Sequence, residues 1–476
     1  MDSPTPSSRR SFLLGTATGV VAGIPLAWWA SRHWRQIVAP YEGKPHEDSR
    51  PAYAMPGPFR GRVVEVRNAH AVSPDNVIDP VVVDGMVNRG MGALTGTSPD
   101  DVRGAWDRFF QKGDVVGIKV NPVGRKPKRG EPGRVPKAVG AISSPALLVK
   151  VVRCLEKVGI PRRDIVVFER YAEEFCDAGY ADLVERELPG VRWMASAVRY
   201  TDTQVDISGF DQGRGSCSAE MGRHVVGYDP DVFTVMGFCG PQHENDERRH
   251  RSHLSAIVTR LVDKIITLPV LKDHRSAGVT LALKNMSHGM NNNVARSHLP
   301  GDAHGYAQGA AGFGPNQCNT FIPQAVAQHA LRQKATLHIL DGLIGVYEGG
   351  PGNWNKTWGT WRHKGLFFAT DPVAMDHVGW DVLDAQRAAQ GWPGVGQMGL
   401  VHQTPAVHAS TGLTVLAGSG PLETAALATA AQNLHAGRAS EVFNLRQPDH
   451  VVLAGKLGLG VFDADGIAHE IKVVRG

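Results

Sequence analysis

The sequence predicts an α/β protein with a mainly parallel sheet and helices on both faces, arranged as one domain or as two Rossmann-like lobes. Strand-like and helix-like segments alternate along the chain, and neighbouring parallel strands need such crossover connections. Gly and Pro residues bound the strand-like runs, as expected where buried strands end in turns. The chain has 476 residues, enough for one large domain or two of ordinary size.

The predicted strands are short apolar runs, such as DVVGIKV between Gly113 and Pro122. They cover residues 62–66, 114–120, 164–168, 263–268 and 336–340.

The predicted helices have apolar residues at helical spacing and recognisable ends. They cover residues 79–91, 99–111 and 146–158. Ser98 and Ser144 precede the last two helices as candidate N-caps, and Gly159 ends the last one.

Polar side chains follow four of the predicted strands. These strands run into Asn121, residues 169–170, residues 272–274 and Asp341. Because ligands bind beyond the carboxyl ends of parallel strands, we expect these side chains to meet at one site.

The segment 272–293, KDHRSAGVTLALKNMSHGMNNN, concentrates polar residues around a short apolar stretch. Burying so many polar groups without partners is costly, so their density indicates a functional site. Lys272 and Lys284 suit an anionic substrate, and either could act as a base if burial lowered its pKa. His274 could be a general base, a metal ligand or a structural residue. The predicted catalytic residues are His274, Lys272 and Lys284, and the predicted substrate-binding residues are Lys119, Asn121, Asn285 and His288.

Carboxylates in two later loops, together with one histidine, could hold a divalent or transition metal ion. The predicted metal ligands are His274, Asp341, Glu348 and Asp376. Asp371 precedes Pro372 at a predicted helix start, so we interpret it as an N-cap rather than as a ligand. The glycine-rich loop 348–352 could close over a ligand or serve as a connector.

The N-terminus carries the signature of twin-arginine export, SRRSFLL at residues 8–14, followed by a mostly apolar run to Ala30. Trp28 and Trp29 close that run, as is typical of a membrane interface. We expect an exported, periplasmic or extracytoplasmic protein that uses the export machinery and is held by an uncleaved segment or cleaved at an unusual site. The predicted organisation is a signal or anchor at 1–30, a linker at 31–57 and the α/β domain at 58–476.

Charge and motifs exclude several classes of protein. The formal net charge is +5, part of which lies in the N-terminal region, so nucleic acid is not an expected partner. The 5 cysteines have no C-x-x-C spacing, and an iron–sulfur cluster is therefore not expected. The motifs of dinucleotide binding, P-loop hydrolysis, zincin proteolysis and the serine hydrolase elbow are all missing from the sequence.

An ordered set of short segments resembles the DUF362 family, a domain of uncharacterised function. The segments are KGDVVGIKVNPVG (112–124), SSPALLVKVVRCLEKVG (143–159), ITLPVLKDH (266–274), GVTLALKN (278–285), LDGLIGVYEGGPG (340–352), ATDPVAMD (369–376) and GLGV (458–461). The resemblance implies site residues at Lys119, Asn121, Lys272, His274, Lys284, Asn285, Asp341, Gly349, Gly350, Pro351, Asp371 and Asp376. Some members carry an added ferredoxin-like segment, which this sequence lacks.

Two functions fit these features. The first is an exported enzyme that acts on a small anionic or polyhydroxylated substrate with help from a metal or another cofactor. The second is a non-catalytic periplasmic protein that binds a metal, a cofactor or a ligand at the same site. The density of titratable groups favours the enzyme.

Overall fold

The computed structural model describes residues 54–124, 141–200, 204–210, 219–235, 247–274, 276–294, 297–298, 318–353, 358–392, 394–395, 405–407, 414–416 and 448–474. The chain divides into two units, Met1–Arg50 and Pro51–Gly476, and all described residues belong to the second. The predicted export signal and apolar run lie outside the described residues. None of the described helices combines the length and apolar character needed to cross a bilayer.

Eleven strands form one mixed sheet, with the order β15–β1–β12–β10–β7–β2–β3–β4 along its main path and β8, β9 and β11 attached. The strands are β1 (Arg62–Asn68), β2 (Val116–Lys119), β3 (Ile165–Tyr171), β4 (Arg192–Ala197), β7 (Lys264–Thr267), β8 (Val270–His274), β9 (Gly278–Val279), β10 (Ala335–Glu348), β11 (Gly359–Trp361), β12 (Gly365–Ala369) and β15 (Ala468–Val474). On the main path, β12 pairs antiparallel with both of its neighbours, and every other pair is parallel. The predicted mainly parallel α/β class is confirmed.

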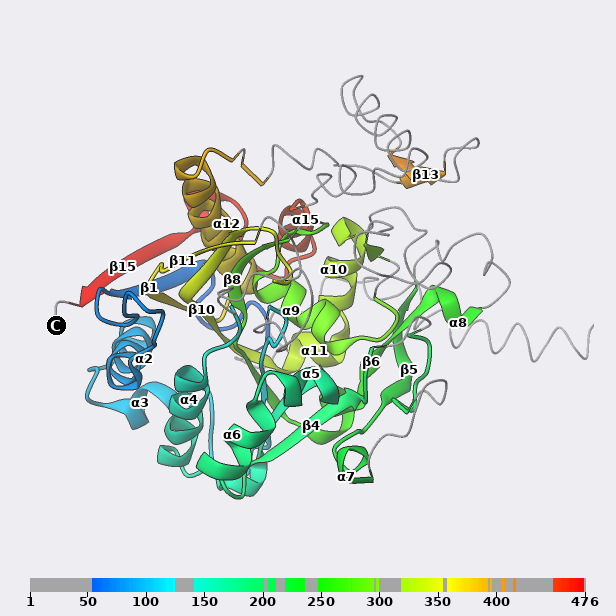
Figure 1. Cartoon of the computed structure of the whole chain (residues 1–476), viewed down its shortest axis with the longest axis horizontal. Helices are drawn as coiled ribbons and strands as arrows, with labels where there is room; N and C mark the ends of the chain where they lie inside the picture. Colours follow the sequence, from blue (N-terminus) through cyan, green and yellow to red (C-terminus); the bar gives the residue numbers. More distant parts are fainter. Residues whose placement is uncertain are drawn as a thin grey trace, which may run out of the picture. The chain divides into compact units, whose positions relative to one another are not determined.

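Helices cover both faces of this sheet, as predicted (Figure 1). They are α2 (Pro80–Thr95), α3 (Val102–Trp106), α4 (Pro145–Lys157), α5 (Ala172–Asp177), α6 (Tyr180–Glu187), α9 (Leu281–Met290), α10 (Cys318–Val326), α11 (His329–Lys334), α12 (Pro372–Ala389) and α15 (His450–Lys456). Successive strand residues point to opposite faces. Accordingly, Val167 of β3 lies in the apolar cluster with α2 to α6, and Val166 lies in the cluster with α9, α10, α12 and α15.

Smaller elements lie outside the large sheet. They are the antiparallel pair β5 (Tyr228–Val235) and β6 (Arg251–Ser255), the antiparallel pair β13 (Pro405–Val407) and β14 (Thr414–Leu416), and the short helices α7 (Ala219–Gly222) and α8 (Glu247–His250).

The observed helix ends can be compared with the predicted N-caps. The Ser144 hydroxyl accepts a hydrogen bond from the Leu147 N–H at the start of α4, as predicted. Asp371 caps α12 and also accepts hydrogen bonds from two backbone N–H groups outside that helix, so its predicted structural role is confirmed. The predicted helix 99–111 is wrong in extent, because α3 covers only Val102–Trp106 and is capped by Asp101 rather than Ser98.

The four strands that carry polar ends lie side by side, as expected from the sequence. β10, β7, β2 and β3 are consecutive and parallel, so their carboxyl ends share one edge. After β7, Pro269 interrupts the strand, and the chain continues as β8, which pairs with the long strand β10. This arrangement carries Lys272, Asp273 and His274 along β10 beyond the end of β7.

Candidate functional site

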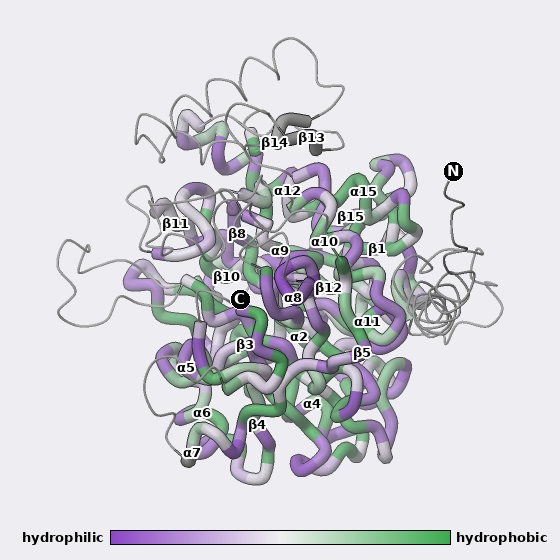
Figure 2. The backbone as a smooth tube through the Cα atoms, turned by 90° about the vertical axis from the view of Figure 1, so that its right-hand side faces the viewer, coloured by the Kyte–Doolittle hydropathy of each residue, from purple (hydrophilic) through white to green (hydrophobic). Residues whose placement is uncertain are grey.

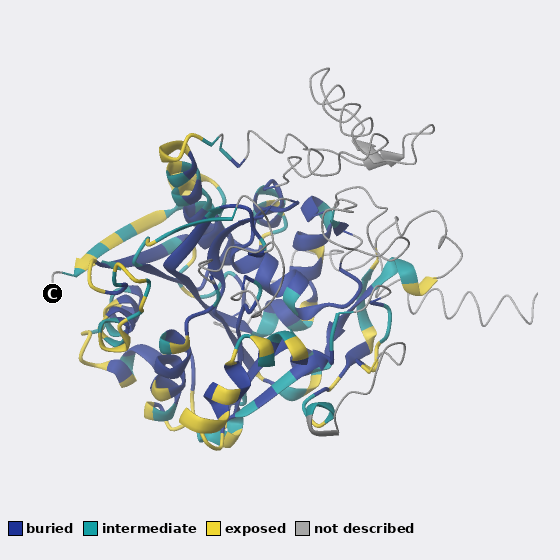
Figure 3. Cartoon of the chain, in the orientation of Figure 1, coloured by how far each residue is buried: buried dark blue, intermediate teal, exposed yellow. Residues whose placement is uncertain are grey.

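The polar segment predicted as the site forms β8 and the helix α9, which lie against one another. The Thr280 N–H, at the start of α9, donates to the Lys272 carbonyl of β8 at 2.8 Å. Figure 2 shows the hydrophilic stretch of β8 near β10 and α9. Figure 3 shows the same elements in the colour of buried residues. Polar side chains are therefore concentrated in the interior, where each needs a partner.

Lys272 and Lys284 are buried amines on these two elements, with 0% and 7% of their surface exposed. The Lys272 ammonium donates to the Val123 carbonyl, and Lys284 Nζ lies 3.3 Å from Nε2 of His298. Burial, and after it the charge of Lys284, lower the pKa of Lys272 to about 7. Burial also lowers the pKa of Lys284 to about 7. Within the described residues, neither amine pairs with a carboxylate.

His274 is held in one tautomer by two backbone N–H groups of the turn that follows β8. Its Nδ1 accepts hydrogen bonds from the N–H groups of Ser276 (3.0 Å) and Ala277 (3.1 Å). An imidazole nitrogen that accepts carries no proton, so the proton of the neutral ring lies on Nε2. This geometry opposes the predicted roles of general base and metal ligand, because Nδ1 is occupied and Nε2 is a donor.

The predicted binding residues Lys119 and Asn285 meet at the end of β2. The Lys119 ammonium donates to Glu169 of β3 and lies 3.3 Å from Oδ1 of Asn285. Burial is the main reason that the pKa of Lys119 is lowered, and Glu169 opposes that effect. Nδ2 of Asn285 is buried and has no hydrogen-bond partner within the described part of the chain. Asn285 therefore has a donor to offer to a ligand, whereas Lys119 already has an ion-pair partner.

Asn121 and His288 have local partners. Oδ1 of Asn121 accepts from the Val123 N–H at 3.1 Å, which closes a turn after β2. His288 lies between two serine hydroxyls, with Nδ1 3.0 Å from Ser287 and Nε2 2.9 Å from Ser297. Its carbonyl accepts from Arg170 of β3 at 2.7 Å, which ties α9 to the end of that strand.

The structure does not gather the predicted metal ligands around one point. Asp376 caps α9 by accepting from the N–H groups of Ala282 and Leu283 at 2.7 and 2.9 Å. Asp341 accepts from the N–H groups of Ser144 and Leu343. Glu348 pairs with the buried Arg387 at 2.6 Å. Each of these carboxylates therefore stabilises the fold. The predicted grouping of His274, Asp341, Glu348 and Asp376 as metal ligands is corrected accordingly.

The glycine-rich loop 348–352 packs directly on β8. The Gly350 N–H donates to the Asp273 carboxylate at 2.7 Å. A Cβ at Gly350 would lie 1.9 Å from the Asp273 carbonyl oxygen, so only glycine fits there. The close approach of the two backbones explains this glycine as a packing requirement.

A different group of potential metal ligands, which includes none of the four predicted ones, occurs among the described residues. Ligand atoms of His288, His298 and Cys318 lie within 4.8 Å of one another. Neither His298 nor Cys318 is among the site residues predicted from the sequence. No spacing rule connects these three positions, so the sequence alone could not have assembled them.

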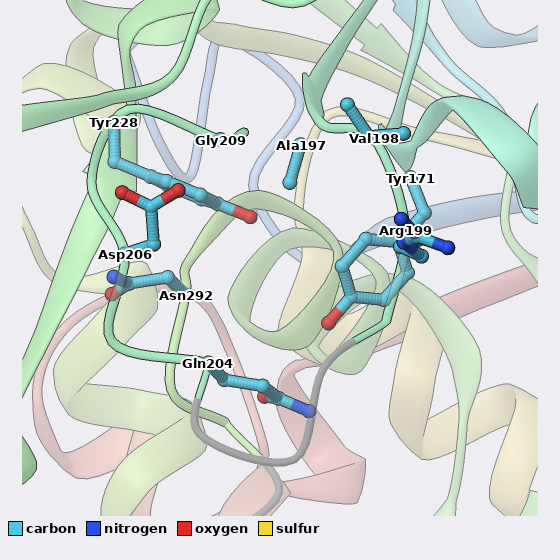
Figure 4. A pocket seen from close by; sticks show the side chains of 9 residues that line it. All are labelled: Tyr171, Ala197, Val198, Arg199, Gln204, Asp206, Gly209, Tyr228 and Asn292. Atoms are coloured by element: carbon cyan, nitrogen blue, oxygen red, sulfur yellow. The ribbon is translucent and has the colours of Figure 1, made fainter. Parts of the chain in front are cut away.

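A small pocket lies next to the site, at the ends of β3 and β4 (Figure 4). Tyr171 and Tyr228 stand on opposite sides of it in Figure 4, and Asp206 and Asn292 also line it. The guanidinium of Arg170 lies 4.3 Å from the ring of Tyr171. The pocket thus has polar and aromatic walls beside the strand that carries Arg170.

The fold and the position of these residues define an α/β protein with a buried polar cluster at the carboxyl edge of its parallel strands, where sheets of this class bind ligands. The profile of the family described as "Domain of unknown function (DUF362)" matches residues 116–381, more than half of the chain. The chain belongs to the DUF362 family, which confirms the resemblance seen in the sequence. No curated protein matches the chain.

Proposed function

We propose that this protein is an exported enzyme that binds a small anionic substrate between Lys272 and Lys284 and transfers a proton to or from it. The observation that carries the proposal is a pair of buried amines without a carboxylate partner in the described part of the chain. Burying two amines without a directly paired carboxylate is unfavourable, and a bound carboxylate or phosphate would relieve that cost.

Each residue has a separate role in this proposal. Lys284 holds the anionic group of the substrate. Lys272, with a pKa of about 7, is partly deprotonated at neutral pH and can accept a proton. Nδ2 of Asn285, which has no hydrogen-bond partner in the described part of the chain, donates to a substrate oxygen. A hydroxyl-bearing carboxylate would use all of these donors.

Replacing Lys284 with methionine is expected to weaken anion binding about 10- to 100-fold, because a charge-assisted hydrogen bond contributes roughly 1.5–3 kcal/mol. Isothermal titration with phosphate, oxalate, malonate and tartrate measures this effect. The matched control is Lys112→Met, which removes an exposed lysine outside the site and should leave affinity unchanged. Failure of the wild-type protein to bind any of these anions would contradict the proposed anion site.

Two of these anions, malonate and tartrate, can distinguish an enzyme from a non-catalytic binding protein. In D₂O, the wild-type protein is expected to exchange the C–H protons next to the carboxylate of malonate or tartrate, and Lys272→Met should lose that exchange. Proton NMR follows the loss of signal. Binding without exchange by the wild-type protein would favour a non-catalytic ligand-binding protein.

The proposed location rests on the N-terminal sequence. Changing Arg9 and Arg10 together to lysine is expected to leave the protein in the cytoplasm, because the export machinery recognises the arginine pair. Cell fractionation with immunodetection measures the distribution, and intact mass shows whether the N-terminal segment is removed. Equal distribution of wild-type and variant protein would contradict twin-arginine export.

A further inference from the structure

Three side chains from separate segments converge beside α9. His288 lies in the last turn of α9, Cys318 begins α10, and His298 lies between these two helices in the sequence. Their ligand atoms all lie within 4.8 Å of one another. The rings of His288 and His298 are 4.8 Å apart between centroids and nearly perpendicular. His288 and Cys318 are buried, and His298 is half-buried.

We propose that His288, His298 and Cys318 form a three-ligand site for a transition metal ion of the zinc type. Two imidazoles and one thiolate suit zinc, cobalt or copper, and they disfavour magnesium and calcium, which prefer oxygen ligands. Ligand atoms around tetrahedral zinc lie roughly 3.4–3.6 Å apart, given bonds of about 2.0–2.3 Å. Separations of up to 4.8 Å would therefore shorten by at most about 1.4 Å when the ion binds.

The surroundings already orient two of the ligands. Nδ1 of His298 lies 3.3 Å from the Val294 carbonyl, which directs Nε2 away from the backbone. The Ser287 hydroxyl lies 3.0 Å from Nδ1 of His288, and such a contact fixes the ring orientation of a metal-bound histidine. Metal binding would replace two contacts, that of His288 Nε2 with the Ser297 hydroxyl and that of His298 Nε2 with Lys284 Nζ.

Three protein ligands leave a fourth position open, as in catalytic zinc sites. Lys284 Nζ lies 3.3 Å from Nε2 of His298, so its charge is next to that position. An anion could then bind the metal ion and Lys284 together. This last step rests on the proposed function, whereas metal binding itself does not.

The test uses the full-length protein treated with chelator, dialysed and titrated with Co²⁺ alone. One Co²⁺ ion per chain is expected, with a thiolate-to-cobalt charge-transfer absorption that Zn²⁺ removes by displacement. Cys318→Ser should abolish this absorption and weaken Co²⁺ binding about 100-fold or more. The matched control is Cys154→Ser, which changes another buried cysteine, in the opposite apolar cluster, and should bind Co²⁺ like the wild-type protein.

Two outcomes would overturn the metal site: a wild-type protein that binds no Co²⁺ stoichiometrically, or a Cys318→Ser protein with unchanged affinity and absorption. Circular dichroism of the serine variant, which is close in size to cysteine, shows that the fold is retained. Titration of the chelator-treated protein with phosphate tests the lysine site separately. The failure of one proposal can thus be distinguished from the failure of the other.

Discussion

Replacing Arg387 with methionine is expected to lower the free energy of unfolding by about 3–5 kcal/mol. Arg387 is fully buried, and its Nη1 donates to the Glu348 carboxylate at 2.6 Å and to the Tyr347 carbonyl at 2.7 Å. The same nitrogen lies 3.8 Å from the Asp273 carboxylate. The substitution removes the cation beside two buried carboxylates. Leaving these carboxylates buried without a cation costs more free energy than the intact ion pair contributes to stability. Denaturant unfolding measures the difference.

A surface ion pair provides the control for this prediction. Arg162 pairs with Glu156 at 2.6 Å, and both side chains are about one-third exposed, so Arg162→Met should change stability by less than about 1 kcal/mol. In the Arg387→Met background, Glu348→Gln should recover part of the lost stability, because it removes one buried charge. An Arg387→Met protein as stable as the wild type would contradict a charged pair at this position.

The core of the fold could be predicted from the sequence because its signals are local. β2, β3 and β7 are continuous apolar runs that end at Pro or polar residues, and their parallel order follows from the helices between them. The pairing of β1 with β12 and β15 could not be predicted in this way. It joins segments far apart in the chain, and β15 alternates exposed and half-buried residues like an edge strand.

The buried polar cluster could be predicted from the sequence, but the partners of its side chains could not. The density of polar residues in 272–293 correctly marked a buried polar cluster. Asp376 resembles a metal ligand in the sequence, yet it caps a helix that begins about one hundred residues earlier in the chain. His274 likewise resembles a base until the N–H groups of Ser276 and Ala277 are seen on its Nδ1. Whether a polar side chain bonds to the backbone or is available to a ligand depends on tertiary contacts, which the local sequence does not contain.

The second large effect expected is a pH-dependent gain in stability from Lys272→Met. In the folded protein the pKa of Lys272 is about 7, against an ordinary value of 10.5. Between these two values the unfolded chain binds a proton that the folded protein does not, so Lys272 makes wild-type stability rise with pH, by up to about 1.4 kcal/mol per pH unit. At pH 7 and below, the wild-type protein bears the full cost of the buried lysine, and methionine removes it. The stability advantage of the variant should therefore be largest near pH 7 and shrink toward pH 10.

Denaturant unfolding of both proteins at several pH values between 7 and 10 measures this difference, and other titrating groups cancel in the comparison. Lys112→Met, which removes a lysine from an exposed position, is the matched control. A saturating anion that pairs with Lys272 would favour its charged form, raise its folded pKa and flatten the slope. If the difference between wild type and Lys272→Met is independent of pH without an added anion, Lys272 keeps its proton in the fold and is not the base of the proposed reaction.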